Sequence, residues 1–489
     1  MASPTILAID QGTTSTRAIL FDVHGTVLRA AALPLPQLYP GHGWVEHDPE
    51  AIWAGTVSTC REVLAGGAAP AAIGITNQRE TAVVWDRRTG RAIHNAVVWQ
   101  DRRTAARCAE LVAAGHEPMV TGRSGLVIDP YFSATKIGWI LGHAEAMGAA
   151  RRGDLAFGTV DSFLLWRLTG GRVHATDATN AARTGLFNIH DGAWDPVLLD
   201  LHGIPAAMLP EVRDNAADFG TTQPGLIGGA TTIGAMAGDQ QAALVGHACF
   251  APGDAKCTYG TGAFMIANTG TVPVASTNRL LTTVGYRLAG VTTYALEGSI
   301  FVTGAAVQWL RDGLGLIRTA AESADLAASV PDSGGVYAVP ALTGLGAPYW
   351  DPDARGLICG MDRGATAAHL VRATLEAVCF QTRDLIEAMR RDGIPAIPTL
   401  RVDGGMTAND WLMGRLAGLT GLPVERAAVA ETTALGVACL AGLQAGLYGS
   451  LADIMQRRTP DRVWQPSVPA AQRDSLYAGW QAAVRRARS

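Results

Sequence analysis

Short apolar runs that end in polar tips predict strands joined by tight turns. Residues 6–9 form an apolar run that ends in Asp10, four hydroxyl-bearing residues follow Gly12, and a second apolar run covers 18–21. This order predicts a β-hairpin with a polar tip. Residues 255–268 repeat the order around a Gly/Thr tip. Because each hairpin opens one half of the chain, the pattern predicts a duplicated α/β architecture.

Helical spacing and capping residues predict the helices. Asp48 and Pro49 begin a helix with apolar positions up to Leu64, and Thr366 caps a long amphipathic helix that stops near Gly393. The Ala/Gly-rich run 433–448 predicts a close-packed soluble helix.

The remaining segments between the helices predict turns, loops and strands. We expect a hairpin over 82–100, a polar loop over 177–183, and a turn at Gly298 that leads into a helix carrying Gln308. Residues 400–402 predict a strand, and a helix is predicted from about Asn409.

Length and composition indicate a two-domain globular protein. A chain of 489 residues is too long for one core, and the Pro-Gly turn within 249–253 marks the predicted boundary, which gives domains 1–250 and 251–489. The net charge of −4 leaves no electrostatic footprint for nucleic acid. The seven scattered cysteines predict reduced thiols, with neither disulfides nor a zinc site. Since no signal peptide or membrane span is evident, we expect a cytoplasmic protein without membrane insertion.

The two hairpin tips carry candidate phosphate chemistry. Hydroxyls and backbone amides beyond Gly12 are donors suited to phosphate oxygens, and Asp10 is a hard oxygen ligand suited to Mg²⁺. The alternative is an ordinary hairpin with a Thr-rich turn. Gly404 and Gly405 follow a predicted strand, and bare backbone at such a position suits a nucleotide.

Candidate substrate chemistry lies at other element ends. Arg79 and Glu80 follow the strand predicted at 72–76; they form either a surface pair or, if the backbone bends, two walls of one site. Asp239 is a helix N-cap, and it is also suited to accept a proton from an alcohol. Trp99 suits either the core or a ligand platform.

Seven motifs, in order and nearly end to end, carry a resemblance to a known family. They are D-Q-G-T-T at 10–14, G-I-T-N-Q-R-E-T at 74–81, W-Q-x-R-R at 99–103, G-D-Q-Q at 238–241, Y-G-T-G at 259–262, G-L-G-A-P-Y-W at 344–350 and V-D-G-G at 402–405. Together they resemble the FGGY family of carbohydrate kinases, and within it the members that phosphorylate glycerol.

The resemblance implies a fold, an activity and a set of site residues. The fold would be two ribonuclease-H-like domains of the actin and hexokinase type, with an interdomain cleft. The activity would be ATP-dependent phosphorylation of glycerol to sn-glycerol 3-phosphate, with ADP as the other product, Mg²⁺ at Asp10 and Asp239 as the general base. Glycerol would be bound by Arg79, Glu80, Trp99, Tyr131, Asp239, Gln240 and Phe264. The nucleotide would be bound by Thr13, Thr14, Ser15, Arg17, Thr261, Gly304, Gln308, Gly405 and Asn409.

Two alternatives and one departure remain beside this resemblance. The chain could phosphorylate another polyol or a ketose, or it could be an actin-like ATPase switch; a homo-oligomer is also possible. In some bacterial members, fructose 1,6-bisphosphate binds a Gly-rich loop through an Arg, but Ala230 occupies that position here and residues 221–238 contain no Lys, Arg or His. We therefore expect insensitivity to the bisphosphate, and the missing His also disfavours activation by phosphorylation of a histidine there.

Overall fold

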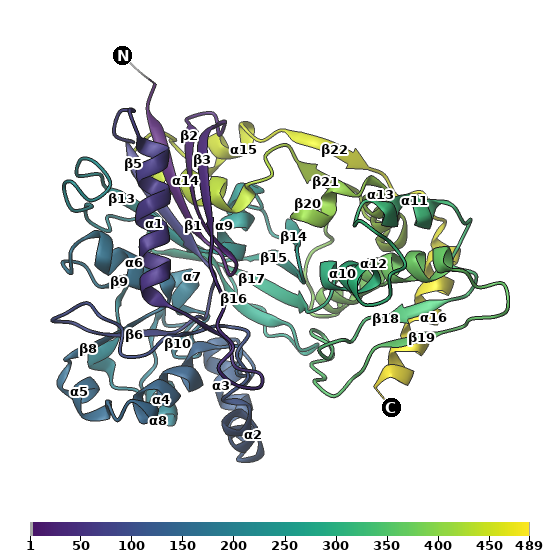
Figure 1. Ribbon diagram of the computed structural model, residues 1–489, viewed down its shortest axis with the longest axis horizontal. Helices are drawn as coiled ribbons and strands as arrows, with labels where there is room; N and C mark the ends of the chain where they lie inside the picture. Colours follow the sequence, from purple (N-terminus) through teal and green to yellow (C-terminus); the bar gives the residue numbers. More distant parts are fainter. Residues whose placement is uncertain (1–2, 489) are drawn as a thin grey trace.

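The computed structural model describes residues 3–488, and Figure 1 shows two lobes, each built around a β-sheet. The first sheet has the strand order β13-β5-β1-β2-β3. Strands β1 and β2 form the predicted antiparallel hairpin. On the other side of β1, strand β5 pairs parallel with β1, and β13 pairs parallel with β5. The strands are β1 (Thr5–Gln11), β2 (Ser15–Asp22), β3 (Val27–Pro34), β5 (Ala72–Asn77) and β13 (Ile233–Gly238).

The second sheet repeats this topology with an extra strand at each edge. Its order is β16-β17-β15-β14-β20-β21-β22, so its first strand, β14, again pairs with an antiparallel hairpin partner and with a parallel strand. The predicted duplication is confirmed. The strands are β14 (Ala255–Tyr259), β15 (Ala263–Gly270), β16 (Leu281–Leu288), β17 (Val291–Ile300), β20 (Leu400–Asp403), β21 (Val424–Ala427) and β22 (Pro460–Trp464).

Helices cover both faces of the first sheet, which explains why β1 is apolar throughout. Leu7 and Ile9 pack with α1 (Pro49–Leu64) and α6 (Val160–Leu168), whereas Ile6 and Ala8 pack with α9 (Asp239–Gly246) and α14 (Thr432–Gln444). As predicted, Asp48 caps α1 and accepts a hydrogen bond from the amide of Glu50.

Helix α14 returns from the second half of the chain to the first lobe, where Figure 1 shows it beside β1 and β5. It is the predicted close-packed helix: a Cβ on Gly436 would lie 1.8 Å from the carbonyl oxygen of Ala242 in α9. The core around α14 also contains Ile266 and Ala295 of the second sheet. The two lobes therefore share one apolar cluster.

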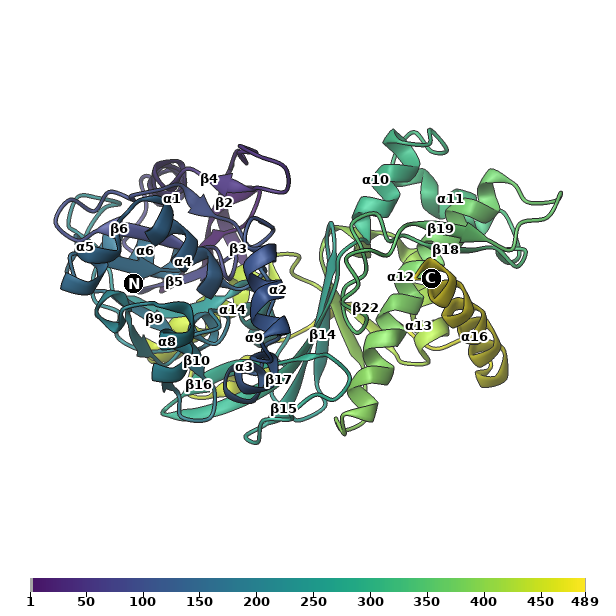
Figure 2. The ribbon, with the colours of Figure 1, turned by 90° about the horizontal axis from the view of Figure 1, so that it is seen from below.

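The second lobe has its own helical layer, which Figure 2 shows on the side of the sheet away from the first lobe. As predicted, Thr366 starts its longest helix, where it forms a capping box with His369, and the helix gives way to Gly393 after Arg391. The helices of this layer are α10 (Gly304–Asp312), α11 (Glu322–Ala328), α12 (Ala367–Arg391), α13 (Asp410–Thr420) and α16 (Ala470–Ala487).

Shorter elements complete the two lobes. The remaining strands are β4 (Glu46–His47), β6 (Val83–Asp86), β7 (Ala96–Val97), β8 (Leu155–Gly158), β9 (Ala175–Asp177), β10 (Phe187–Asn188), β11 (Ala193–Trp194), β12 (Glu211–Arg213), β18 (Tyr337–Val339) and β19 (Leu357–Cys359). The remaining helices are α2 (Ala105–Ala113), α3 (Glu117–Ser124), α4 (Ser133–His143), α5 (Met147–Arg152), α7 (Ala178–Ala181), α8 (Pro196–His202) and α15 (Leu451–Gln456), with 3₁₀ turns η1 (Ala206–Met208) and η2 (Gly405–Ala408).

Two segments differ from their predictions. Residues 177–183 are not a polar loop: they are buried, and Asp177 caps α7 by accepting from the amides of Thr179 and Asn180 at 2.7 and 3.2 Å. Strand β17 runs to Ile300, past the predicted turn at Gly298. The segment 82–100, in contrast, does reverse near 88–90 as predicted: Ala82 and Val97 exchange backbone hydrogen bonds at 3.0 and 3.1 Å, and the amide of Ile93 donates to the carbonyl of Val84 at 2.9 Å. In addition, β6 pairs with β8, and β7 pairs with β4.

The structure also gives the state of the cysteines and the character of the helices. All seven cysteines are free, and all but Cys359 are buried. Between residues 3 and 488, no helix combines the length and the apolar character that crossing a membrane requires.

Candidate active site

All seven predicted substrate residues line one cavity of about 90 Å³. They come from both halves of the chain, because Phe264 lies on β15 and the other six precede the second sheet. Thr13, from the first hairpin tip, lines the same cavity. The complete lining is Thr13, Arg79, Glu80, Trp99, Tyr131, Asp239, Gln240 and Phe264.

A backbone turn after β5 directs Arg79 and Glu80 into this cavity. Glu80 has a φ of 61°, in the left-handed region that non-glycine residues rarely occupy. The bend that the sequence required for a shared site is therefore present. Arg79 and Glu80 are 3% and 1% exposed, so the alternative of a surface ion pair is excluded.

Four buried charges form a neutral cluster behind the cavity. Arg79 binds Glu297 through two nitrogens, at 2.5 and 3.0 Å. Arg183 donates from Nε to Glu80 at 2.6 Å, and its Nη2 lies 3.1 Å from Glu297 Oε1. Burial by itself raises the pKa of Glu297, but the two guanidinium groups overcome this and hold it at about 2. Burial raises the pKa of Glu80 above its ordinary value in spite of Arg183 and Arg79.

Sequence patterns did not identify Arg183 or Glu297. Arg183 lies at the end of the segment that was predicted to be a polar loop, so its burial was not expected. Glu297 lies in the otherwise apolar middle of β17. A lone carboxylate at such a position is a signal for a buried partner, but it does not say which residue the partner is.

Asp239 presents the most accessible carboxylate of the cavity. It is the first residue of α9, and Gly238 takes the N-cap position, so the predicted cap is wrong by one residue. Its Oδ1 accepts from the amide of Gln240 at 2.7 Å and lies 3.0 Å from Arg79 Nε. The side chain is 31% exposed. Among residues 3–488, no hydrogen bond is made to Oδ2, so this oxygen is available to a ligand.

Three aromatic rings form the opposite wall. The ring of Trp99 lies edge-on to Tyr131 and to Phe264, with centroids 5.5 and 6.0 Å apart. The indole Nε1 donates to Thr13 Oγ1 at 2.9 Å. Trp99 is therefore both a wall of the cavity and a link to the first hairpin tip.

That first tip carries a buried carboxylate at its base. Asp10 is 2% exposed, and burial raises its pKa to about 6 although Arg17 opposes the shift. Its Oδ2 lies 2.8 Å from Arg17 Nη2 but makes no hydrogen bond of good geometry. Arg17 also reaches Glu431, at the start of α14, at 2.5 Å. At the tip itself the amide of Gly12 donates to the carbonyl of Ser15, and Thr14 is exposed.

The second tip meets two further loops through glycine contacts. Gly404 has a φ of 90°, and a Cβ there would lie 2.4 Å from the carbonyl oxygen of Tyr259. A Cβ on Gly304 would lie 2.5 Å from the carbonyl of Gly260. In contrast, a Cβ on Gly405 would have no neighbouring atom within 4 Å. The loops at 259–262, 304 and 404–405 thus meet at one place with bare backbone.

The predicted nucleotide residues fall into two groups, one at each tip. Thr13, Thr14, Ser15 and Arg17 belong to the first. Thr261, Gly304 and Gly405 belong to the second, from which Gln308 and Asn409 extend along two helices. Gln308 is exposed on α10, whereas Asn409 caps α13 by accepting from the amide of Leu412 at 2.9 Å.

Two arginines from neighbouring elements contact the loop that contains Ala230. Ala230 itself is exposed. Arg61 donates to the carbonyl of Leu226 at 2.7 Å, and Arg172 donates to the carbonyl of Thr221 at 2.9 Å. Both guanidinium groups thus already bind backbone oxygens of the loop.

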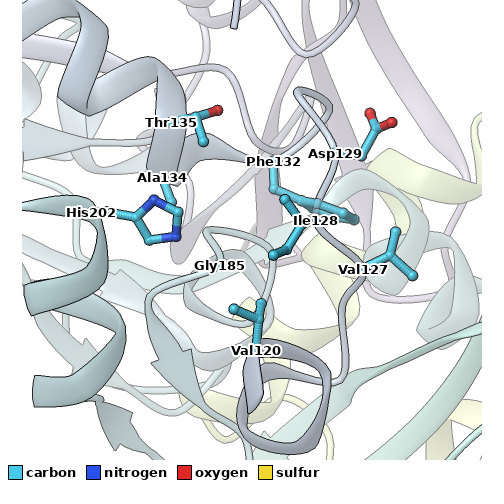
Figure 3. A pocket seen from close by; sticks show the side chains of 9 residues that line it. All are labelled: Val120, Val127, Ile128, Asp129, Phe132, Ala134, Thr135, Gly185 and His202. Atoms are coloured by element: carbon cyan, nitrogen blue, oxygen red, sulfur yellow. The ribbon is translucent and has the colours of Figure 1, made fainter. Parts of the chain in front are cut away.

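A second, smaller cavity of about 20 Å³ lies behind the aromatic wall and is shown in Figure 3. Phe132 lines it, and the ring of Phe132 lies 5.0 Å from that of Tyr131. Two of its polar side chains are already bound: Asp129 pairs with Arg102 at 2.9 Å, and Thr135 lies 2.8 Å from the hydroxyl of Thr104. This volume holds about one water molecule, so we assign no ligand to it.

The chain resembles curated proteins along almost its whole length. It is 61% identical to a glycerol kinase of Rhodospirillum centenum, covering 99% of this chain and 98% of that protein. It is 60% identical to glycerol kinase 1 of Pseudomonas aeruginosa, covering 99% of both chains.

Solved structures agree with the fold. A crystal structure of Plasmodium falciparum glycerol kinase with ADP superposes with a TM-score of 0.94 at 35% identity, covering 99% of this chain and 98% of that one. A xylulose kinase from Rhodospirillum rubrum gives 0.86 at 25% identity, covering 98% of both chains. Residues 5–246 match the N-terminal domain of the FGGY family of carbohydrate kinases, and residues 255–445 match its C-terminal domain. The chain therefore belongs to the FGGY family of carbohydrate kinases.

Proposed function

We propose that the protein transfers the γ-phosphoryl group of ATP to a terminal hydroxyl of glycerol and forms sn-glycerol 3-phosphate and ADP. The observation that carries this proposal is the cavity that gathers Asp239 and six partner side chains beside the first hairpin tip. The names of the relatives described above support the same substrate.

The size and lining of the cavity suit a three-carbon polyol. A volume of about 90 Å³ has room for several water-sized groups, which suits a small polyol such as glycerol. Arg79 and Gln240 offer hydrogen-bond donors, while Glu80 and Asp239 offer acceptors, as a row of hydroxyls requires. Trp99 and the other two rings offer an apolar wall for the carbon edge.

Asp239 is the proposed general base. Its Oδ1 is held by Arg79 and by the backbone, while Oδ2 is available to accept the proton of the attacking hydroxyl. A carboxylate in this role is sufficient for phosphoryl transfer, where catalysis depends mainly on position and charge neutralisation.

ATP would lie between the two hairpin tips. The hydroxyls and amides of Thr13, Thr14 and Ser15, with Arg17, would bind phosphates on one side. The loops of Thr261 and Gly304 would lie on the other side, and the open face of Gly405, with Gln308 and Asn409, would receive the rest of the nucleotide.

Asp10 fits the role of a magnesium ligand. Its Oδ2 is buried and makes no hydrogen bond of good geometry, although it lies 2.8 Å from Arg17 Nη2; a carboxylate oxygen is a ligand suited to a hard cation. We propose that Asp10 would hold Mg²⁺ together with phosphate oxygens of the nucleotide. When bound, Mg²⁺ would neutralise developing charge on the phosphates.

The proposal includes the domain boundary near residue 250 and a cleft between the two domains. Closure of the domains around the substrate would exclude water, the competing nucleophile. ATP and glycerol are both available in the cytoplasm, where we propose that the protein acts.

Steady-state ADP formation tests the proposal against both alternatives. We expect slow ATP turnover alone, strong stimulation by glycerol, and one glycerol 3-phosphate formed for each ADP. A higher kcat/KM with xylulose, gluconate or another polyol would identify a different carbohydrate kinase. Turnover that glycerol and the other polyols leave unchanged would favour the ATPase switch.

A further inference from the structure

Lys256 lies beside the substrate cavity and is completely buried, at 0% exposure. It belongs to β14 in the second sheet, whereas the residue it contacts, Gln240, belongs to α9 and lines the cavity. Its ammonium group donates to Gln240 Oε1, and also to Thr258 Oγ1 at 2.9 Å.

This contact determines which atoms of Gln240 face the cavity. An ammonium group can only donate hydrogen bonds, so the oxygen of the carboxamide must face Lys256. The amino group of the carboxamide then points to the other side. In the described part of the chain, Gln240 Nε2 has no acceptor of its own, although the residue is only 6% exposed.

Lys256 also has a reason to stay charged in its buried position. Burial lowers its pKa, but the carboxylates of Asp403 and Asp239 oppose this shift. Asp403 is itself fixed, with Oδ2 3.0 Å from His247 Nε2 and in contact with the hydroxyl of Thr432. A buried charge is costly unless it is paired and hydrogen-bonded. The buried ammonium group of Lys256 therefore strongly favours the orientation in which the carboxamide oxygen of Gln240 accepts its hydrogen bond.

We propose that Lys256 is a positioning residue that holds the carboxamide of Gln240 so that it presents only hydrogen-bond donors to the substrate. The cavity then has two donors, Arg79 and Gln240, and two acceptors, Glu80 and Asp239. Without Lys256, the carboxamide could turn over and offer its oxygen. This inference rests on the proposed function, because it assigns Gln240 to the substrate site.

The first test replaces Lys256 with Met, which has a similar length and no donor. The polyol with the highest kcat/KM for the wild type is identified first, so that failure of the glycerol assignment is recorded separately. For that polyol, Lys256→Met should raise KM at least about tenfold, because the substrate loses one hydrogen bond from the fixed amino group of Gln240. The KM for ATP should change less than about twofold.

A double-mutant cycle separates positioning from a general structural effect. In a Gln240→Leu background, Lys256→Met should raise the KM of the polyol no further, because the group on which it acts is gone. If the two effects multiply in the double variant, Lys256 does not act through Gln240 and the inference is wrong.

Gln240→Glu tests the donor assignment even if Lys256→Met does not fold. Glu has the same shape and keeps an oxygen for Lys256, but it places a second oxygen where the amino group faces the cavity. We expect KM for the polyol to rise at least about tenfold, with the thermal midpoint close to that of the wild type. An unchanged KM would show that the substrate needs no donor from Gln240 and would overturn the inference.

Discussion

Replacing Arg183 with Met tests the buried charge cluster. The wild-type cluster contains two guanidinium groups and two carboxylates, and the variant leaves two carboxylates for Arg79 alone. Glu297 loses Arg183 at 3.1 Å but keeps its two contacts with Arg79, so the larger loss falls on Glu80, which Arg183 contacts at 2.6 Å. Breaking a buried ion pair on one side costs about 3–5 kcal/mol, and we expect a decrease of this size in the free energy of unfolding.

The variant should also change the dependence of stability on pH. Burial already raises the pKa of Glu80, and the loss of Arg183 removes the largest charge that opposes the shift. The folded variant will therefore bind a proton at Glu80 more tightly than the unfolded chain. Its stability deficit relative to the wild type should shrink as the pH falls from about 8 to about 5.

Urea titrations at these two pH values measure both effects, and steady-state kinetics report KM for glycerol. Arg107→Met is the control, because Arg107 and Glu110 form an exposed pair 3.1 Å apart whose loss should cost less than about 1 kcal/mol. The cluster would not have the proposed role if Arg183→Met lost no more stability than Arg107→Met at pH 8 and kept the wild-type KM.

Three further predictions concern other parts of the molecule. Gly405→Ala should leave thermal stability unchanged, since its Cβ would meet no atom within 4 Å, but should weaken ATP binding measured by calorimetry; unchanged affinity would remove Gly405 from the nucleotide site. Burial raises the pKa of Asp384 from 3.8 to about 6, so the folded protein binds this proton more tightly than the unfolded chain. This carboxyl should therefore add up to about 3 kcal/mol to the free energy of unfolding as the pH falls from about 7 to about 4, and Asp384→Asn should remove that part of the profile in urea titrations. Fructose 1,6-bisphosphate up to millimolar concentration should not inhibit initial rates at saturating MgATP, because Ala230 offers no charged group; strong inhibition would show binding through other groups, such as Arg61.

The family resemblance predicted the residues that line the cavity, and most of them lie in contiguous motifs at the ends of predicted strands and helices. Tyr131 and Phe264 lie outside those motifs, so only the resemblance indicated them. Asp10 and Asp239 each follow an apolar run and begin a turn or helix, so local patterns indicate them as candidates. The bend at Glu80 was expected only on the condition that Arg79 and Glu80 share a site, and its φ of 61° satisfies that condition.

The residues behind the cavity could not be predicted in the same way. Arg183, Glu297 and Lys256 are single charged residues, and their partners lie far away in the sequence. Their burial depends on how β14 and β17 pass beside α9, which no local pattern encodes. The segment after Asp177 was also predicted to be a polar loop, but it is a buried helix whose N-terminus is capped by the Asp177 carboxylate.

The proposed role of Asp239 can be measured most directly by comparing Asp239→Asn with the wild type in glycerol-dependent ADP formation. Asn keeps the shape of the side chain and an oxygen for Arg79, but it cannot accept the proton of the attacking hydroxyl. We predict that kcat falls by roughly 10²–10⁴-fold while the affinity for MgATP stays nearly the same. A purified, folded variant that retained more than about half of the wild-type kcat would contradict the account.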